Sequence, residues 1–198
     1  APLQSLTRGF IGPKVTIFPH QLFIVQAAAA RQIQRLLLAD EVGLGKTIEA
    51  CLIMHQLLLT NKIERVLIIV PDPLLYQWFI ELYRKFNITF TILDAEFYQN
   101  AQKNNPEINP FETTQLGLTT PQFIFNRQDY QEELLAAGWD LVIIDEIHHW
   151  QEKTPEYIWC QKLAEQTANL LLLTATPEML GYKSLFAICR ILYPDIYH

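Results

Sequence analysis

The sequence predicts an α/β fold with a mostly parallel central sheet and helices on both faces. Short apolar runs recur along the 198 residues, and most of them are continuous rather than alternating, which is typical of strands covered on both faces. Segments with a helical pattern separate these runs, and strand–helix alternation favours a parallel sheet. With 50% hydrophobic residues, the chain can bury the core of about one domain without disulfides or metals.

The strands are expected where apolar residues run with little interruption. In chain order these runs are RLLLA at 35–39, VLIIV at 66–70, FTIL at 90–93, QLGLT at 115–119, LVII at 141–144 and LLLL at 170–173. Helices are expected between them, at 23–34, 47–59, 74–86, 129–137, 156–165 and 182–192. Residues 95–114 interrupt this order because they are rich in Asn, Gln, Pro and Glu, and we expect a long surface excursion there.

The net charge argues against a protein that holds nucleic acid by bulk positive charge. Fifteen Lys and Arg side chains stand against 21 Asp and Glu side chains, which gives a net charge of −6. Proteins that bind through the phosphate backbone alone show the opposite balance. Any contact with nucleic acid is therefore expected from a local surface or from chain beyond these 198 residues.

The cysteines and the hydropathy predict a reducing compartment and no membrane. Cys51, Cys160 and Cys189 lie far apart, with no CxxC and no His at ligand spacing, which argues against a zinc site or a disulfide framework. No apolar run approaches the roughly 18 residues of a membrane span, and residues 1–12 lack a signal-peptide pattern. Because the chain starts without Met and stops abruptly at His198, we expect residues 1–198 to be one domain excised from a longer protein.

A phosphate loop is predicted where the first expected strand leads into a helix. The segment reads LADEVGLGKT and ends in GxGKT, Gly43–Thr47. Gly43 and Gly45 let backbone N–H groups turn toward an anion, and the helix beginning near Lys46 adds its positive end. Lys46 can reach the β- and γ-phosphates of a nucleotide, and the Thr47 hydroxyl can bind Mg²⁺. We expect the phosphates of a nucleotide to be held by Gly43, Leu44, Gly45, Lys46 and Thr47.

Only the last part of the segment, GxGKT, matches the phosphate-loop pattern. The strict pattern asks for Gly at the position of Asp40. The bland alternative is a glycine-rich turn with a chance Lys-Thr pair, but the flanking strand and helix favour the phosphate loop.

An acidic pair follows the expected strand at 141–144. Carboxyl ends of parallel strands gather at one edge of a sheet, where ligands bind, so Asp145 is expected beside the phosphate loop. Asp145 suits Mg²⁺, and Glu146 is placed to orient and deprotonate an attacking water. The alternative is a strand end whose acids only face solvent.

Polar side chains after this pair predict a link to the next strand end. His148 and His149 lack a third metal ligand, so we expect His148 to hydrogen-bond toward the next motif; a buried His bonded to backbone is the alternative. The run at 170–173 ends in Thr174-Ala-Thr-Pro, and Thr174 and Thr176 can connect the acidic pair to a ligand above the sheet. Ordinary capping before a helix begun by Pro is the bland interpretation.

The order GxGKT, DExH, TATP resembles the Swi/Snf-type branch of the superfamily-two helicase-like ATPases. Within that family, the stretches at 19–21, 109–115 and 173–181 are similar to a bacterial branch whose members associate with RNA polymerase. The resemblance extends from about residue 17 to residue 198. It implies a RecA-like P-loop lobe, the first of two, in a bacterial cytoplasmic, nucleoid-associated protein.

The resemblance also implies roles for individual residues. Gln21 matches the residue that reads adenine. Lys46, Thr47, Asp145 and Glu146 match the phosphate, Mg²⁺ and catalytic-base positions, and the segment Thr174–Thr176 matches the motif that couples hydrolysis to DNA movement. The segments at 70–78 and 118–122 match those that grip a nucleic-acid strand, with contacts expected at Pro71, Thr119 and Thr120. Helix starts and hydroxyls would meet phosphates there, since both segments are poor in Lys and Arg; plain helix caps are the alternative.

The sequence departs from the family pattern at two positions. Cys51 stands where the family often has a small Gly, which we expect to change only helix packing. Ile147 replaces the commoner Ala of the DEAH pattern, and its bulk could shift His148 slightly.

Members of the family place ATP between two lobes, and the second lobe supplies an arginine finger. Without that arginine the rate is expected to fall by about 10³ or more, so the 198-residue chain alone should bind ATP·Mg²⁺ weakly and hydrolyse it very slowly. The leading hypothesis is an ATP-driven motor on double-stranded DNA that remodels a complex with RNA polymerase. A P-loop kinase for a small molecule predicts a lid and no TATP strand, and a non-catalytic module predicts loss of Lys46 or Glu146.

Overall fold

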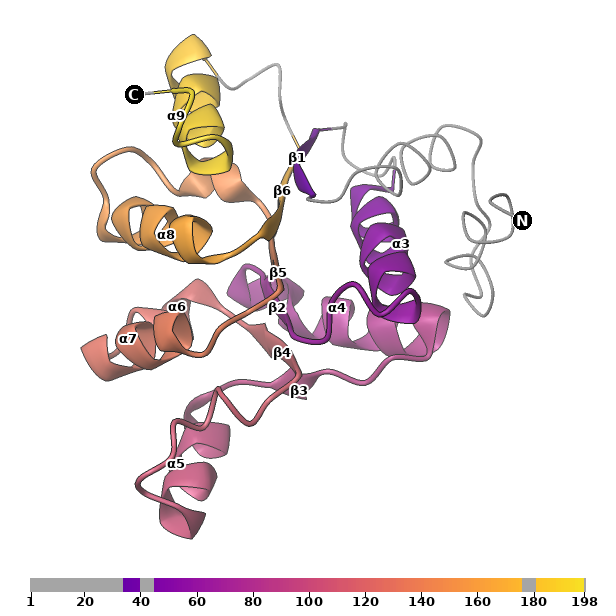
Figure 1. The fold of residues 1–198 in the computed structure, drawn as a ribbon, viewed down its shortest axis with the longest axis vertical. Coiled ribbons are helices and arrows are strands. Elements are labelled where there is room, and N and C mark those ends of the chain that lie inside the picture. The colour runs from indigo at the N-terminus through magenta and orange to yellow at the C-terminus, as the bar shows by residue number, and fades with distance from the viewer. Residues whose placement is uncertain (1–33, 40–44, 176–180, 198) are drawn as a thin grey trace.

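The computed structural model describes residues 34–39, 45–175 and 181–197. The centre of this part of the chain is a sheet of six strands in the order β1-β6-β5-β2-β4-β3, in which neighbouring strands pair in parallel (Figure 1). The strands are β1 (Arg35–Ala39), β2 (Val66–Ile69), β3 (Thr91–Ile92), β4 (Leu116–Thr119), β5 (Leu141–Ile144) and β6 (Asn169–Thr174). The α/β class and the parallel sheet predicted from the apolar runs are confirmed.

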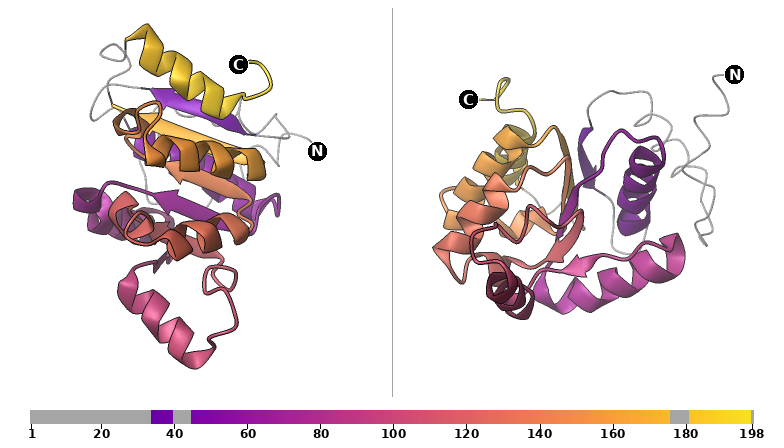
Figure 2. Two further views of the ribbon diagram at one scale, coloured as in Figure 1. Left: turned by 90° about the vertical axis from the view of Figure 1, so that its left-hand side faces the viewer. Right: turned by 60° about the horizontal axis from the view of Figure 1, so that its bottom comes forward.

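Helices cover both faces of the sheet (Figures 1 and 2). One face carries α3 (Lys46–Leu59) and α4 (Leu75–Glu81), which a 3-10 turn (Asp72–Leu74) precedes and a π turn (Leu82–Phe86) extends. The described helices on the other face are α5 (Ala95–Asn104), α6 (Pro121–Ile124), α7 (Gln128–Ala136), α8 (Pro155–Gln166) and α9 (Tyr182–Leu192).

Alternate residues of the central strands feed two separate cores. In β5, Val142 and Ile144 join the cluster under α6, α7, α8 and α9, whereas Leu141 and Ile143 join the cluster under α3 and α4. All four side chains are fully buried. This burial on both faces explains why the sequence of β5 is a continuous apolar run.

Several element boundaries differ from the sequence prediction. The region expected as a surface excursion begins with α5, because Asp94 caps it by accepting a hydrogen bond from Phe97 N at 2.8 Å. Its Tyr98 packs on Phe111, with ring centroids 5.8 Å apart. The third strand shortens to two residues. Residues 23–33 of the first expected helix lie outside the described residues, and Gln34 is not helical.

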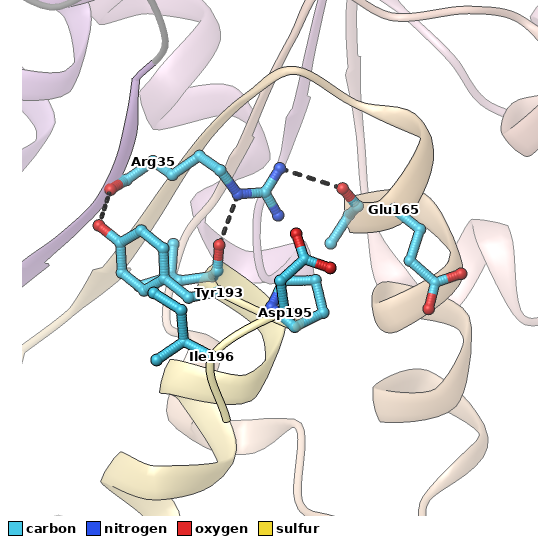
Figure 3. Close-up of a pocket in the computed structure, with 8 residues that line it drawn as sticks. Arg35, Glu165, Tyr193, Asp195 and Ile196 are labelled. Atoms are coloured by element: carbon cyan, nitrogen blue, oxygen red, sulfur yellow. Dashed lines mark hydrogen bonds between the residues drawn. The ribbon is translucent and has the colours of Figure 1, made fainter. Parts of the chain in front are cut away.

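Arg35 ties the start of β1 to the ends of two helices (Figure 3). Its guanidinium donates to Leu192 O at 2.5 Å, to Ile191 O at 3.0 Å and to Thr167 O at 2.7 Å. The Tyr193 hydroxyl donates to Arg35 O at 2.6 Å. Because carbonyls at helix ends are negative, this cation fixes α8 and α9 against the sheet.

Three further expectations concern the whole molecule. Within the described ranges, no helix is long and apolar enough to cross a membrane. The same residues hold no cluster of three or more His, Cys, Asp or Glu side chains that could bind a metal ion. The three cysteines are free thiols, and burial raises the pKa of Cys51 and of Cys160.

Candidate active site

Helix α3 begins at the expected phosphate loop. Gly45 precedes it with φ 101°, a left-handed conformation that an L side chain would strain. Gly45 O accepts from Glu49 N at 2.9 Å, so the helical hydrogen bonds start here. Lys46 is 9% exposed and Thr47 is half-buried. The first turn therefore presents a cation, a hydroxyl and the positive end of a helix of 14 residues.

Asp145 continues β5 beyond the sheet. Its N–H donates to Ile69 O at 2.9 Å, as the next rung of the β5–β2 ladder. Its Oδ1 accepts from Glu146 N at 2.9 Å and its Oδ2 accepts from Trp78 Nε1 at 2.9 Å. The residue is 7% exposed, and burial raises the pKa of its carboxyl group, while the Trp78 hydrogen bond and the Lys46 charge oppose the rise.

Glu146 lies in a strained backbone conformation. Its φ of 51° and ψ of 45° are left-handed, which is uncommon for a residue other than Gly, Asn or Asp. The turn directs its Oε2 to Ala175 N at 3.3 Å and to His148 Nδ1 at 3.1 Å. Strain of this kind, roughly 1–3 kcal/mol, persists where the surroundings enforce it and is common at active sites.

His148 bridges the ends of β5 and β6. Its Nδ1 lies 3.1 Å from the Thr174 hydroxyl and 3.1 Å from Glu146 Oε2. Thr174 is fully buried. Burial and the neighbouring His149 lower the pKa of His148, although Glu146 raises it. A hydrogen bond therefore joins His148, shortly after the acidic pair, to Thr174 at the end of the next strand.

The carboxyl edge of the sheet encloses a cavity of about 480 Å³. Lys46, Thr47, Asp145 and Glu146 are all among the residues that line it. Residues 99 positions apart, Lys46 and Asp145, thus face one space, as the parallel sheet predicts. The remaining lining residues are Gly45, Ile48, Leu74, Gln77, Trp78, Glu81, Lys85 and Ala175.

Sequence reasoning missed three contributions to this cavity. Trp78 belongs to a segment predicted to grip nucleic acid, yet it bonds Asp145. The backbone N–H of Ala175 contacts the Glu146 carboxylate. Glu81 of α4 and Lys85 of the π turn that extends it line the cavity and form an ion pair of 3.3 Å. Trp78 follows β2, the strand beside β5, so the order of the strands could have placed it near Asp145. Nothing in the sequence around Trp78 indicated that it would bond Asp145.

Four of the predicted site residues lie outside the described residues: Gln21, Gly43, Leu44 and Thr176.

The residues expected to contact nucleic acid occupy the carboxyl ends of β2 and β4. Pro71 is half-buried and precedes the 3-10 turn. Thr120 caps α6 by accepting from Phe123 N at 3.3 Å, and its hydroxyl donates to Asp72 Oδ1 at 2.9 Å. Thr119 is fully buried, and its hydroxyl donates to Leu93 O at 2.9 Å. The Thr119 hydroxyl is therefore turned into the protein. Thr120 is also buried, with 5% of its surface exposed, whereas Pro71 is half-buried.

The donor set fits a nucleotide with a hard divalent cation. A hydroxyl, a buried carboxylate and space for phosphate oxygens and water are the ligands that Mg²⁺ takes. An ammonium group beside a helix start suits phosphate. Burial raises the pKa of Asp145, and the positive charge of Lys46, which lines the same cavity, is among the effects that oppose this rise.

Comparison with known proteins places this arrangement in context. The family described as "Type III restriction enzyme, res subunit" (ResIII) matches residues 14–179. The RNA polymerase-associated protein RapA of Erwinia tasmaniensis is 46% identical over 196 residues, and RapA of Klebsiella pneumoniae is 47% identical over 194. These matches cover 97% and 96% of this chain. The chain spans 20% of the length of each of these relatives.

Solved structures share the fold at lower identity. The Sulfolobus solfataricus SWI2/SNF2 ATPase core in complex with dsDNA has a TM-score of 0.73 at 22% identity, over 93% of this chain and 37% of that one. The Pyrococcus furiosus Hef helicase domain has a TM-score of 0.65 at 23% identity, over 87% and 35%. These likenesses confirm the expectation of a RecA-like lobe.

Proposed function

Because this chain belongs to the ResIII family and is a Swi/Snf-type superfamily-two helicase-like domain, we propose that its carboxyl-edge cavity binds ATP with Mg²⁺ and hydrolyses the γ-phosphate. The observation that carries the proposal is that Lys46 and Thr47 line the same cavity as Asp145 and Glu146. A cation, a hydroxyl and two carboxylates around one space are the parts that phosphoryl transfer to water requires.

The phosphates are bound by the start of α3. Lys46 neutralises the β- and γ-phosphates, and the N–H groups at the start of α3 point toward their oxygens. Thr47 and Asp145 hold Mg²⁺, which when bound neutralises charge that develops on the phosphate oxygens. Burial of Asp145 keeps water from competing with these charges.

Glu146 is the general base of the proposed reaction. Ala175 N–H donates to its Oε2, and His148 Nδ1 lies 3.1 Å from the same oxygen, which leaves Oε1 for an attacking water. As the water oxygen bonds to the γ-phosphorus, Glu146 takes a proton and the bridging oxygen leaves with ADP. General-base catalysis of this kind contributes roughly 10²–10⁴ in rate.

Through His148 and Thr174, a change at Glu146 would reach the end of the neighbouring strand β6. The bond between them at 3.1 Å joins the ends of β5 and β6. A change in the Glu146 carboxylate would alter its contact with His148 and so reach Thr174. We assign this bridge, and Thr176 further along the chain, to the coupling of hydrolysis to movement on DNA.

Double-stranded DNA is the proposed track, and RNA polymerase in a bacterial cytoplasm is the proposed target. The names of the RapA relatives and the dsDNA in the SWI2/SNF2 neighbour support these two partners. Pro71 and Thr120 lie on adjacent strand ends and are the proposed contacts to the DNA backbone, together with the backbone at Thr119. A second RecA-like lobe would supply an arginine to the transition state, so residues 1–198 alone should turn over very slowly.

The test is the ATPase rate of the intact protein with and without double-stranded DNA at low salt. We expect DNA to stimulate the rate, and Lys46→Ala to remove both basal and stimulated turnover. Lys103→Ala is the matched control, because Lys103 is exposed on α5, away from the cavity lining. A rate that DNA does not change would favour a small-molecule kinase or a non-catalytic module, and full activity in Lys46→Ala would refute the nucleotide site.

A further inference from the structure

The indole of Trp78 is a hydrogen-bond partner that reaches Asp145 from a different element. Trp78 Nε1 donates to Asp145 Oδ2 at 2.9 Å, and both residues are buried, with 2% and 7% of their surfaces exposed. Trp78 belongs to α4, whereas Asp145 follows β5. Strand β2, which leads into α4, pairs with β5 in register. The bond thus joins two neighbouring strand–turn units at the edge where the cavity lies.

The Asp145 carboxylate needs an external orienting group. The torsion that turns an Asp carboxylate is broad, so the residue's own rotamer does not fix the plane of the two oxygens. Here that plane is held at two points, by Glu146 N on Oδ1 and by Trp78 Nε1 on Oδ2. The Glu146 contact is with the adjacent residue and would accompany many side-chain rotations. Of these two contacts, it is the Trp78 bond that fixes the carboxylate relative to a separate element.

Trp78 is suited to this task by its chemistry and its packing. An indole N–H can donate a hydrogen bond but cannot accept one. It therefore requires an acceptor, which here is Oδ2 of Asp145. The ring is anchored in the core under α3 and α4, the cluster that also holds Leu82 and Phe86. Trp78 is also one of the residues that line the cavity. A rigid, buried donor of this kind can hold one carboxylate oxygen while the other lone pairs face the cavity.

We propose that Trp78 is a positioning residue of the ATPase site, orienting the Asp145 carboxylate for the divalent cation. The inference rests on the proposed function, because it assumes that Asp145 binds the metal. Trp78 itself takes no part in proton transfer and acts through Asp145. Loss of a hydrogen-bond partner of a metal ligand typically weakens metal binding about 10–100-fold.

The experiment compares Trp78→Phe with the unchanged intact protein. Binding of Mn²⁺ in the presence of ADP is followed by electron paramagnetic resonance, which needs no turnover, and the ATPase rate is measured across a Mg²⁺ titration. We expect Mn²⁺ affinity to fall about 10–100-fold and half-saturating Mg²⁺ to rise in step, while ADP affinity without metal stays unchanged. Turnover at saturating Mg²⁺ should recover most of its value.

Trp159→Phe is the matched control. The Trp159 indole also donates a hydrogen bond, to Gln131 O at 3.1 Å, and the residue is also buried, but it lies on the opposite face of the sheet. This variant should lose one comparable bond without any change in metal affinity. If Trp78→Phe unfolds the protein, replacing the Trp78 indole with a benzothienyl ring removes the N–H and keeps the bicyclic shape.

The outcomes separate the inference from the proposed function. Wild-type Mn²⁺ affinity in Trp78→Phe, or in the benzothienyl variant, together with lost affinity in Asp145→Asn, would overturn the role of Trp78 and leave the nucleotide site intact. Wild-type Mn²⁺ affinity in Asp145→Asn would overturn the metal assignment itself. Equal losses in Trp78→Phe and Trp159→Phe would mean that any buried indole bond has this effect, which also overturns the inference.

Discussion

Arg35 and Asp145 are ionisable side chains at opposite edges of the sheet, the first half-buried and the second buried, and burial favours the neutral form of each. Burial lowers the pKa of Arg35 and raises that of Asp145. The two differ in what surrounds them. The Arg35 guanidinium donates hydrogen bonds to backbone carbonyls at the ends of α8 and α9. Asp145 accepts two hydrogen bonds and still faces a cavity of about 480 Å³.

A shifted pKa therefore does not by itself distinguish an anchor from a reactive group. A cavity of about 290 Å³ also lies beside Arg35, but the described residues that line it offer no second cation, hydroxyl cluster or helix start to a ligand (Figure 3). At the other end, Lys46, Thr47 and Glu146 converge on Asp145. The feature that indicates chemistry is that several elements bring a cation, a hydroxyl and carboxylates to one space.

Glu146→Gln should remove the chemistry at the cavity end of the sheet while leaving the fold in place. We expect the DNA-stimulated turnover of the intact protein to fall about 10³-fold or more, because Gln cannot accept the proton. Stability to urea should change by less than about 1 kcal/mol, since the Gln oxygen can still accept from Ala175 N. Glu107→Gln, at an exposed position, is the control. Residual turnover near the unchanged level would show that Glu146 is not the base.

The opposite result is expected for Arg35→Met. Removing the guanidinium leaves helix-end carbonyls without donors, which we expect to cost about 3 kcal/mol in the free energy of unfolding. The midpoint of thermal unfolding should then fall by roughly 6–12 °C for a domain of this size. Arg84→Met, at an exposed position, should change it little. If Arg35→Met kept its stability but lost ATPase activity, Arg35 would have a catalytic role and not a structural one.

Tyr193→Phe tests the same anchor more gently. The substitution removes only the hydroxyl that donates to Arg35 O at 2.6 Å, and a net hydrogen bond contributes about 1 kcal/mol. Urea denaturation should register that loss without a change in turnover. Tyr83→Phe, at a residue that is 57% exposed, is the control. Equal stability in the two variants would show that the Tyr193 hydroxyl does not help to hold Arg35 in place.

A pH dependence from His148 should be weaker than any of these effects. The pKa of His148 is lowered in the folded state by burial and by His149, so the unfolded chain binds a proton more readily. The stability from this group is therefore complete above the ordinary histidine pKa of about 6.5 and decreases as the pH falls below it. When the free energy of unfolding is measured with urea at several pH values below about 6.5, His148→Asn should make it depend less steeply on pH. An identical slope in both proteins would contradict the assignment.

Much of this architecture could be predicted because buried parallel strands carry a direct sequence signal. The runs at 66–69 and 141–144 are apolar without interruption, and the sheet brings the residues after both strands to one edge. For the same reason Lys46 and Asp145 could be paired from sequence. Helix α5 could not, since its composition is polar and the Asp94 cap and Tyr98 packing are what favour it. The bond from Trp78 to Asp145 depends on the relative placement of two units, which neither segment encodes alone.

The proposed chemistry requires that Lys46, Thr47, Asp145 and Glu146 surround one nucleotide with its metal. The most direct measurement is a crystal structure of the intact protein with Mg²⁺ and a non-hydrolysable ATP analogue. We predict the γ-phosphate beside the Lys46 ammonium, and Mg²⁺ about 2.0–2.1 Å from the Thr47 hydroxyl with Asp145 bound directly or through one water. A nucleotide seated elsewhere, with Asp145 and Glu146 remote from its phosphates, would contradict this placement.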